Sequence, residues 1–153
     1  MEVLSKIRQL LNKAGVEFEE IKHEPVYTSQ EAAQIRDENI SDGAKSLVLM
    51  GDGKPLLVVV PGDKKADFKK VKAHLHISDL RMATPEEVKQ ITGIEVGAIA
   101  PVGKAMGLDS YYDNSFMFKE MVAFNAGHHE ISIIMKTDDL LKVENPELFD
   151  LTK

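Results

Sequence analysis

One lysine stands out among the residues that could take part in chemistry. Lys45 comes directly before the apolar run Ser46–Met50, where the chain would begin a buried strand. At the rim of a pocket its ammonium group could meet a phosphate or a carboxylate as a point charge. A solvent-facing lysine that flanks a hydrophobic strand explains the same pattern. Taken alone, the pattern favours the second explanation.

An uncharged loop is the second feature of interest. The stretch Val96–Gly103 combines Gly, Ala and Pro with only three larger apolar residues. Gly97 and Gly103 can adopt backbone angles closed to other residues and allow a close approach to the main chain. Pro101 fixes one φ and removes one N–H. Such a loop could present backbone groups to a ligand, but a tight connection packed under a sheet explains it equally well.

The histidines do not form a metal-binding pattern. His128 and His129 are adjacent, so in a strand or turn their side chains point in opposite directions. That is poor geometry for two ligands of one metal ion. His74 and His76 do not share a face of the helix expected there. The chain has no cysteine, which excludes disulfides and thiolate ligands, so we expect no metal ion and no other cofactor.

Length and composition indicate a single globular domain over residues 1–153, with 43% hydrophobic and 29% charged residues. No apolar run approaches the ~20 residues that cross a bilayer. The first residues lack the order of a secretion signal. We therefore expect a cytoplasmic protein with no membrane partner.

The net charge of −6 argues against generic nucleic-acid binding, including binding to DNA. The local charge differs between Lys64 and His76, where five lysines and two histidines stand against Asp67 alone. A solvated helix face explains this run slightly better than a patch that contacts phosphates.

Hydrophobic spacing and turn residues predict the secondary structure. Helical spacing predicts a first helix over Val3–Ala14. Helix caps predict three more, which begin after Thr28, Asp63 and Thr84, and a last helix that begins near Thr137. Strand patterns predict a strand near Val16–Ile21, a hairpin of 46–50 with 56–60, a short strand over 110–113 and a second hairpin of 121–124 with 131–135. Residues 78–83 are expected to be a link, and the chain from Glu144 a loosely held tail. The fold class is α+β, with a central mixed, mostly antiparallel, barrel-like sheet surrounded by helices.

These pieces together resemble the YbaK/aminoacyl-tRNA synthetase-associated domain family, over nearly the whole chain. The family comprises free-standing aminoacyl-tRNA deacylases and the editing insertion of bacterial prolyl-tRNA synthetases. The segments that carry the resemblance are His23-Glu24-Pro25-Val26-Tyr27-Thr28, Ala44-Lys45-Ser46-Leu47-Val48, Gly97-Ala98-Ile99-Ala100-Pro101, Asp113, Asn125-Ala126-Gly127 and Asp138-Asp139-Leu140-Leu141. Their order and spacing are more specific than any one of them.

The resemblance implies the roles of particular residues. Lys45 matches the functional lysine of the family, which contacts the terminal phosphate or the aminoacyl end of the substrate. The catalytic loop of the family matches Gly97, Ala98, Ile99, Ala100 and Pro101. The residues expected to bind the substrate are Tyr27, Thr28, Ser46, Asn125, Gly127, His128 and His129.

The implied activity is hydrolysis in trans of the ester that joins a wrong amino acid to the 3′-terminal adenosine of tRNA. The substrate would be tRNA for proline, or a related tRNA, carrying a small amino acid, and an aminoacyl-tRNA synthetase is a possible partner. Ester hydrolysis passes through an oxyanion, which fixed backbone N–H groups can stabilise without a metal ion. Two alternatives stay open: a tRNA- or synthetase-binding module of the same fold without catalysis, and a hydrolase of small esters.

Overall fold

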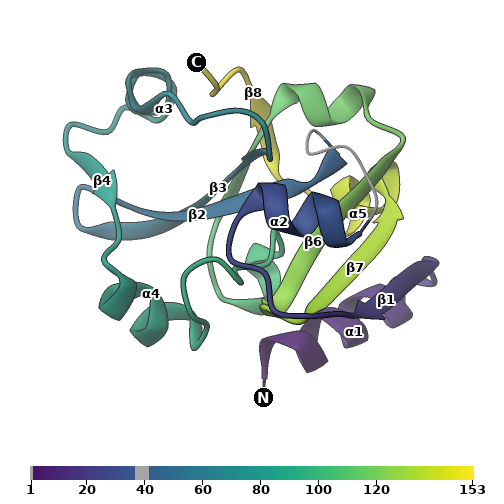
Figure 1. Ribbon diagram of the computed structural model, residues 1–153. Helices are drawn as coiled ribbons and strands as arrows, with labels where there is room; N and C mark the ends of the chain where they lie inside the picture. The colour runs from purple at the N-terminus through teal and green to yellow at the C-terminus, as the bar shows by residue number, and fades with distance from the viewer. Residues whose placement is uncertain (1, 37–41) are drawn as a thin grey trace.

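The computed structural model describes residues 2–36 and 42–153 and contains two β-sheets with helices around them (Figure 1). The first sheet has three strands in the order β1 (Phe18–Lys22), β7 (Ile131–Lys136) and β6 (Met121–His128). The second has five, in the order β4 (Leu80–Met82), β2 (Ala44–Gly51), β3 (Lys54–Pro61), β5 (Ser110–Asp113) and β8 (Glu147–Phe149). An isolated parallel bridge between Gly43 and Ala123 connects the sheets.

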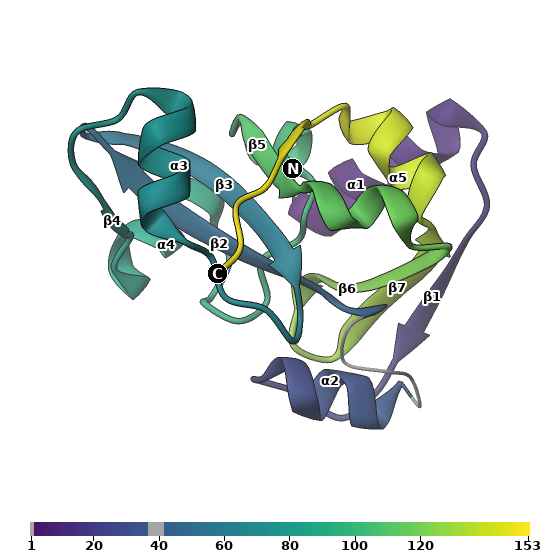
Figure 2. The same ribbon diagram turned by 90° about the horizontal axis from the view of Figure 1, so that it is seen from above.

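Five α-helices and two 3₁₀ turns complete the described fold. The helices are α1 (Val3–Ala14), α2 (Ser29–Ile35), α3 (Phe68–Leu75), α4 (Pro85–Thr92) and α5 (Thr137–Glu144). The 3₁₀ turns are η2 (Gly103–Ala105) and η3 (Asn114–Phe118). Figure 2 shows α1 and α5 beside the β6–β7 hairpin and α3 beside β2 and β3. None of the helices in the described residues is long and apolar enough to cross a membrane.

The two predicted hairpins are confirmed. In the first, β2 and β3 pair antiparallel with Lys45 opposite Val60. In the second, β6 and β7 pair antiparallel, with a bulge between Asn125 and His128. β3 is apolar on both faces because it lies between two cores. One core includes Leu57 and Val59 with α1, whereas the other includes Val58 and Val60 with α3.

Local capping signals set the helix boundaries as expected at several places. Thr28 accepts a hydrogen bond from the amide of Glu31 at the start of α2. A complete capping box of Thr84 and Glu87 begins α4. These pairs satisfy amides that have no partner inside the helix.

Other expectations need correction. The strands form two sheets, which do not close into a barrel in the described part of the chain, although the α+β class with mixed pairing is confirmed. Asp67, not Asp63, caps α3, because its carboxylate accepts from the amides of Lys69 and Lys70. The predicted link at 78–83 contains β4, which pairs with β2.

The predicted loose tail is wrong. Glu144 is 4% exposed, and β8 adds a parallel strand beside β5. Leu151 is fully buried, and its amide donates to the carboxylate of Asp113. The acidic composition of this segment hid its packing, since the buried positions are few and far apart in the sequence.

Candidate active site

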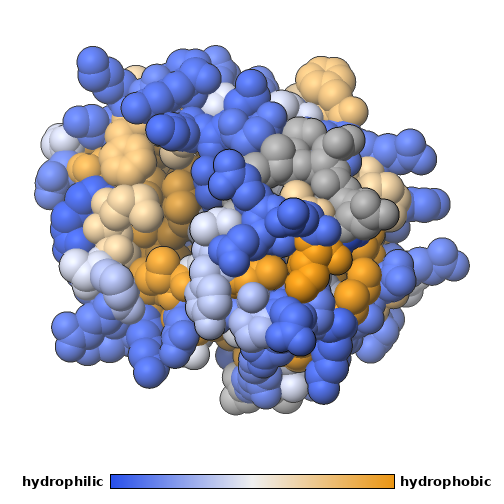
Figure 3. Space-filling model, viewed as in Figure 1, coloured by the Kyte–Doolittle hydropathy of each residue, from blue (hydrophilic) through white to orange (hydrophobic). Residues whose placement is uncertain are grey.

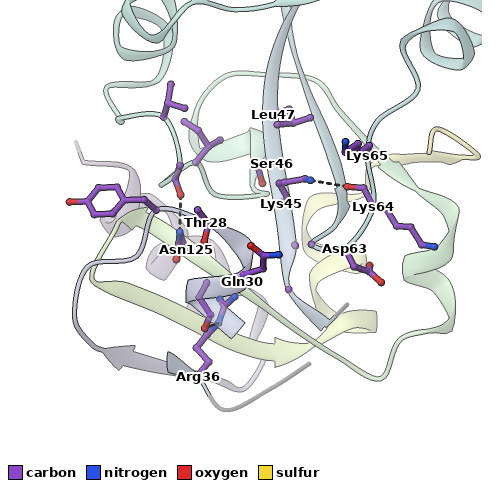
Figure 4. A pocket seen from close by; sticks show the side chains of 18 residues that line it. Thr28, Gln30, Arg36, Lys45, Ser46, Leu47, Asp63, Lys64, Lys65 and Asn125 are labelled. Atoms are coloured by element: carbon purple, nitrogen blue, oxygen red, sulfur yellow. Dashed lines mark hydrogen bonds between the residues drawn. The ribbon is translucent and has the colours of Figure 1, made fainter. Parts of the chain in front are cut away.

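A pocket of about 620 Å³ opens where the first residues of β2 meet α2, the loop after β3 and the loop after α4. This volume is in the range of small-molecule sites. Seven of the residues expected to act on the substrate line it: Tyr27, Thr28, Lys45, Ser46, Gly97, Ile99 and Asn125. Figure 4 shows Lys45 with Lys64 and Lys65 on one side of the pocket, and Thr28 with Asn125 on the other.

Lys45 is held at the pocket by its neighbours. Its Nζ donates a hydrogen bond of 2.7 Å to the carbonyl oxygen of Lys64, which leaves two of its N–H donors for other partners. Burial lowers the pKa of Lys45, and the nearby charge of Lys65 lowers it further, whereas Asp63 raises it. A partly desolvated ammonium next to a second cation is placed to gain from an anionic ligand.

Gly97 brings the loop after α4 close to the segment before α2. Its φ is +93°, a conformation that favours glycine. A Cβ at this position would lie 3.2 Å from Cε1 of His129 and 3.5 Å from the carbonyl oxygen of Tyr27. Glycine therefore permits both the backbone angle and the close approach at this wall of the pocket.

The loop is fixed through its carbonyl groups. Nδ2 of Asn125 donates to the carbonyl of Gly97 at 2.8 Å, and the amide of Gly127 donates to that of Ala98 at 3.0 Å. The buried hydroxyl of Tyr112 donates to the carbonyl of Pro101. The amides of Gly97 and Ile99, by contrast, make no hydrogen bond to another residue of the described chain. The loop thus combines fixed carbonyl groups with two amides that have no partner among the described residues.

Glu144 anchors the far end of the same loop. Its carboxylate accepts from the amide of Gly103 at 2.7 Å and from that of Lys104 at 3.2 Å. Burial raises the pKa of Glu144, although these hydrogen bonds lower it. A Cβ on Gly103 would lie 2.3 Å from the carbonyl oxygen of Leu108. Position 103 therefore has no room for a side chain.

The six remaining expected residues, Ala98, Ala100, Pro101, Gly127, His128 and His129, do not line the pocket. Ala98, Ala100 and Pro101 are buried behind its wall. His128 faces away, with Nε2 2.5 Å from the carboxylate of Glu2. His129 lies beneath Tyr27, with their ring centroids 4.4 Å apart.

Ser46 lines the pocket with an unsatisfied hydroxyl. Its Oγ is buried and has no hydrogen-bond partner in the described residues. Buried polar atoms are rarely left unpaired without a reason. A polar group of a ligand could supply the missing partner.

Sequence reasoning missed Arg36, Lys64 and Lys65 as pocket residues. Arg36 Nε donates to the carbonyl of Ala32, and its Nη1 lies 3.4 Å from Oγ of Ser132. The run from Lys64 to His76 carried the signal for the two lysines, but only its first part reaches the pocket. Lys70 instead pairs with Asp150.

The site therefore combines a cationic side with fixed backbone donors. Four cationic side chains and the single carboxylate of Asp63 line the described pocket, in a chain of net charge −6. The fold and the site define an α+β protein with a positively charged pocket beside a loop in which the amides of Gly97 and Ile99 have no partner among the described residues. Such a pocket can stabilise an oxyanion by hydrogen bonds from the main chain.

Comparison with known proteins identifies the family. Residues 23–143 match the model of the aminoacyl-tRNA editing domain, and the chain belongs to this family. It is 32% identical to the multifunctional Ser/Thr-tRNA deacylase ProXp-y of Escherichia coli (strain K12), over 94% of this chain and 89% of that protein. It is 25% identical to the prolyl-tRNA editing protein ProX of Acetoanaerobium sticklandii, over 87% and 85% of the two chains.

A solved structure supports the same assignment. It belongs to a protein described as a candidate trans-editing enzyme for prolyl tRNA synthetase. The TM-score is 0.84 and the identity 26%, with 100% of this chain and 98% of that chain covered. The sequence resemblance to the editing family is confirmed.

Proposed function

We propose that this protein is an aminoacyl-tRNA deacylase, which hydrolyses in trans the ester between a wrong amino acid and the 3′ end of tRNA. The observation that carries the proposal is the meeting of Lys45 and the Gly97–Ile99 loop in one pocket of an aminoacyl-tRNA editing domain. The relatives named as deacylases and editing proteins match over most of their own length. This coverage supports assigning a deacylase activity to this domain.

The proposed reaction adds water to the ester carbonyl carbon. The carbonyl oxygen becomes an oxyanion, and the amides of Gly97 and Ile99 are the donors proposed to stabilise it. The bond to the ribose oxygen then breaks, and this oxygen takes a proton to restore the hydroxyl of the tRNA. The products are the free amino acid and uncharged tRNA. A well-placed donor in such a site contributes about 3–4 kcal/mol to the transition state.

Lys45 is proposed to hold the substrate. Its ammonium group carries the charge that a phosphate of the terminal nucleotide, or the aminoacyl end, would meet at the pocket rim. Thr28, Ser46 and Asn125 are proposed to line the space for the amino acid and the ribose. The Oγ of Ser46 is the group there that still lacks a partner among the described residues.

The test is deacylation of a panel of mischarged tRNAs by the wild type, by Lys45→Ala and by Lys54→Ala. Lys54 lies at the tip of the same hairpin, outside the pocket, and is the matched control. We expect Lys45→Ala to lower kcat/KM by about 100-fold or more, because the anionic group of the bound substrate would lose its charged partner. The control should behave like the wild type. Near-normal turnover by Lys45→Ala would refute the role of this lysine.

The same panel separates the alternatives. Binding of tRNA by the wild type without hydrolysis of any member would favour a recruiting module. Hydrolysis of small amino-acid esters with no inhibition by uncharged tRNA would favour a small-ester hydrolase. The most rapidly hydrolysed member identifies the amino acid and the tRNA. A synthetase partner and a cytoplasmic location, where charged tRNA is made and used, stay predictions.

A further inference from the structure

The mouth of the pocket carries two features for which ester hydrolysis alone gives no reason. One is the exposed aromatic ring of Tyr27, and the other is the pair of exposed lysines Lys64 and Lys65 in the loop after β3. All three residues line the same pocket. Figure 3 shows hydrophilic residues around the hydrophobic patches on this face of the molecule.

Tyr27 is arranged as a platform. The residue is 64% exposed, yet its ring rests on that of His129, at 4.4 Å between centroids and an interplanar angle of 35°. With one face supported, the other face is left for a partner. An aromatic ring with one face supported and the other face open offers a stacking surface to a ligand.

The support beneath Tyr27 is fixed. Nδ1 of His129 donates to the carbonyl of Val26 at 2.9 Å, and the amide of Val26 donates to the carbonyl of His129 at the same distance. The side chain of His129 is only 11% exposed. Because Tyr27 follows Val26 directly, these two hydrogen bonds hold the platform before any ligand arrives, which reduces the entropy cost of binding.

The two lysines keep their charges available. Neither Lys64 nor Lys65 forms an ion pair with a described residue. Further along the same basic run, Lys70 pairs with Asp150 and His74 lies 2.8 Å from Glu147. Lys64 and Lys65 therefore offer two unpaired charges at the pocket, where the carbonyl of Lys64 also positions Lys45.

We propose that the mouth of the pocket binds single-stranded RNA at its 3′ end, with one base stacked on Tyr27 and backbone phosphates on Lys64 and Lys65. Aromatic stacking beside a basic rim is how proteins hold single strands without reading their sequence. The proposal rests on the proposed function only for the identity of the strand as the end of a charged tRNA. It assigns the stacking base and the phosphates to opposite sides of the pocket.

The lysines are tested by binding of a fluorescently labelled, single-stranded RNA that ends in a 3′ adenosine. Lys64→Ala/Lys65→Ala is compared with Lys13→Ala/Lys54→Ala, which removes the same charge from exposed positions outside the pocket. Because the first double variant can no longer neutralise the two phosphates, the slope of log Kd against log salt should fall by ~1.4. The control should keep the wild-type slope. Equal slopes in both double variants would overturn the phosphate assignment.

The platform is tested in the same assay with Tyr27→Ala and Tyr27→Phe. Loss of one stacked base should weaken binding roughly tenfold or more in Tyr27→Ala. Tyr27→Phe keeps the ring and should bind within about twofold of the wild type. Because Tyr27 is exposed, both variants should retain the wild-type Tm. Wild-type affinity in Tyr27→Ala would overturn the stacking assignment.

The outcomes separate this proposal from the proposed function. RNA binding that depends on Tyr27, Lys64 and Lys65, without hydrolysis of any charged tRNA, would support the strand site and refute the deacylase. Hydrolysis of charged tRNA with an unchanged KM in both Lys64→Ala/Lys65→Ala and Tyr27→Ala would refute the strand site and leave the deacylase standing. A wild type that does not bind the RNA would overturn the strand site directly.

Discussion

The two sides of the pocket are built in different ways. The Gly97–Gly103 side is held by hydrogen bonds from β5, β6 and α5, which fix three of its carbonyls and the amide of Gly103. The Gly62–Lys65 side presents exposed charged side chains on a short loop. One side consists of fixed backbone groups, whereas the other consists of exposed charged side chains.

The two sides of the pocket are suited to different tasks. Stabilising an oxyanion requires donors that are already in place, because reorganising them would cost part of the stabilisation. Attracting a phosphate chain requires charge and little geometric precision. We therefore expect changes behind the Gly97–Gly103 side to alter stability and kcat, and changes on the lysine side to alter KM and its salt dependence.

Gly103→Ala should have the largest effect. The added Cβ would lie 2.3 Å from the carbonyl oxygen of Leu108 and 2.8 Å from Oε2 of Glu144, so the backbone must shift. We expect a loss of about 3 kcal/mol in the free energy of unfolding, measured by urea denaturation. Gly107→Ala is the control, since it has a φ of +70° but no atom within 4 Å, and should cost about 1 kcal/mol. Equal costs would show that the packing at Gly103 is not tight.

Gly97→Ala should come next and should affect activity as well as stability. Its φ of +93° is strained for alanine, and the Cβ would press on His129. We expect a cost of about 2 kcal/mol and a fall of about tenfold in kcat/KM. Gly53→Ala, at φ +83° in the hairpin turn with nothing nearby, matches the backbone strain and should leave kcat/KM unchanged. A similar fall in both variants would argue that the loop position itself is unimportant.

Tyr112→Phe isolates one anchor of the loop. It removes the buried hydroxyl that donates to Pro101 and leaves that carbonyl unpaired. The expected cost is about 1–2 kcal/mol in stability, with a lower kcat and an unchanged KM for charged tRNA. The measurement is steady-state kinetics beside denaturation. A change in KM alone would contradict the division of tasks between the two sides.

The pH dependence that Glu144 contributes to stability should be the smallest of these effects, and Glu144→Gln is the variant that lacks it. Burial raises the pKa of Glu144 above its ordinary 4.5, so the folded state binds this proton more tightly than the unfolded state. The contribution of Glu144 protonation to the free energy of unfolding is fully present below pH 4.5. It is lost as the pH rises through the raised pKa. The wild type should therefore lose stability relative to Glu144→Gln over that window. Parallel curves of unfolding free energy against pH would refute this.

Sequence reasoning succeeded where the signal is local. The capping box at Thr84 and the hairpin of β2 with β3 depend on residues within a few positions of each other. The placement of β8 beside β5 depends instead on a contact between segments about 35 residues apart. The many polar residues of these segments hide the few buried ones. For the same reason the anchoring by Glu144 and Tyr112 could not be read from the sequence.

The sequence predicts only part of the site, because the pocket also depends on contacts between distant segments. Lys45 and the Gly97 loop were singled out by residue type and by the order of the family's segments, and the fold brings both to one pocket. Ala98, Ala100 and Pro101 lie in the same loop but behind its surface. Which residues of a loop face a cavity depends on its backbone path, which the composition leaves open. Their roles in catalysis stay predictions.

The α+β class, the two hairpins, the family and the interest of Lys45 can all be predicted from the sequence. Local hydrophobic patterns and turn residues encode the class and the hairpins, whereas the order of the family's segments indicates the family and Lys45. Tertiary structure alone decided that Lys64 and Lys65 join Lys45, that His129 supports Tyr27 while His128 faces Glu2, and that Glu144 anchors Gly103. These contacts join residues distant in sequence, so only the folded chain brings them together.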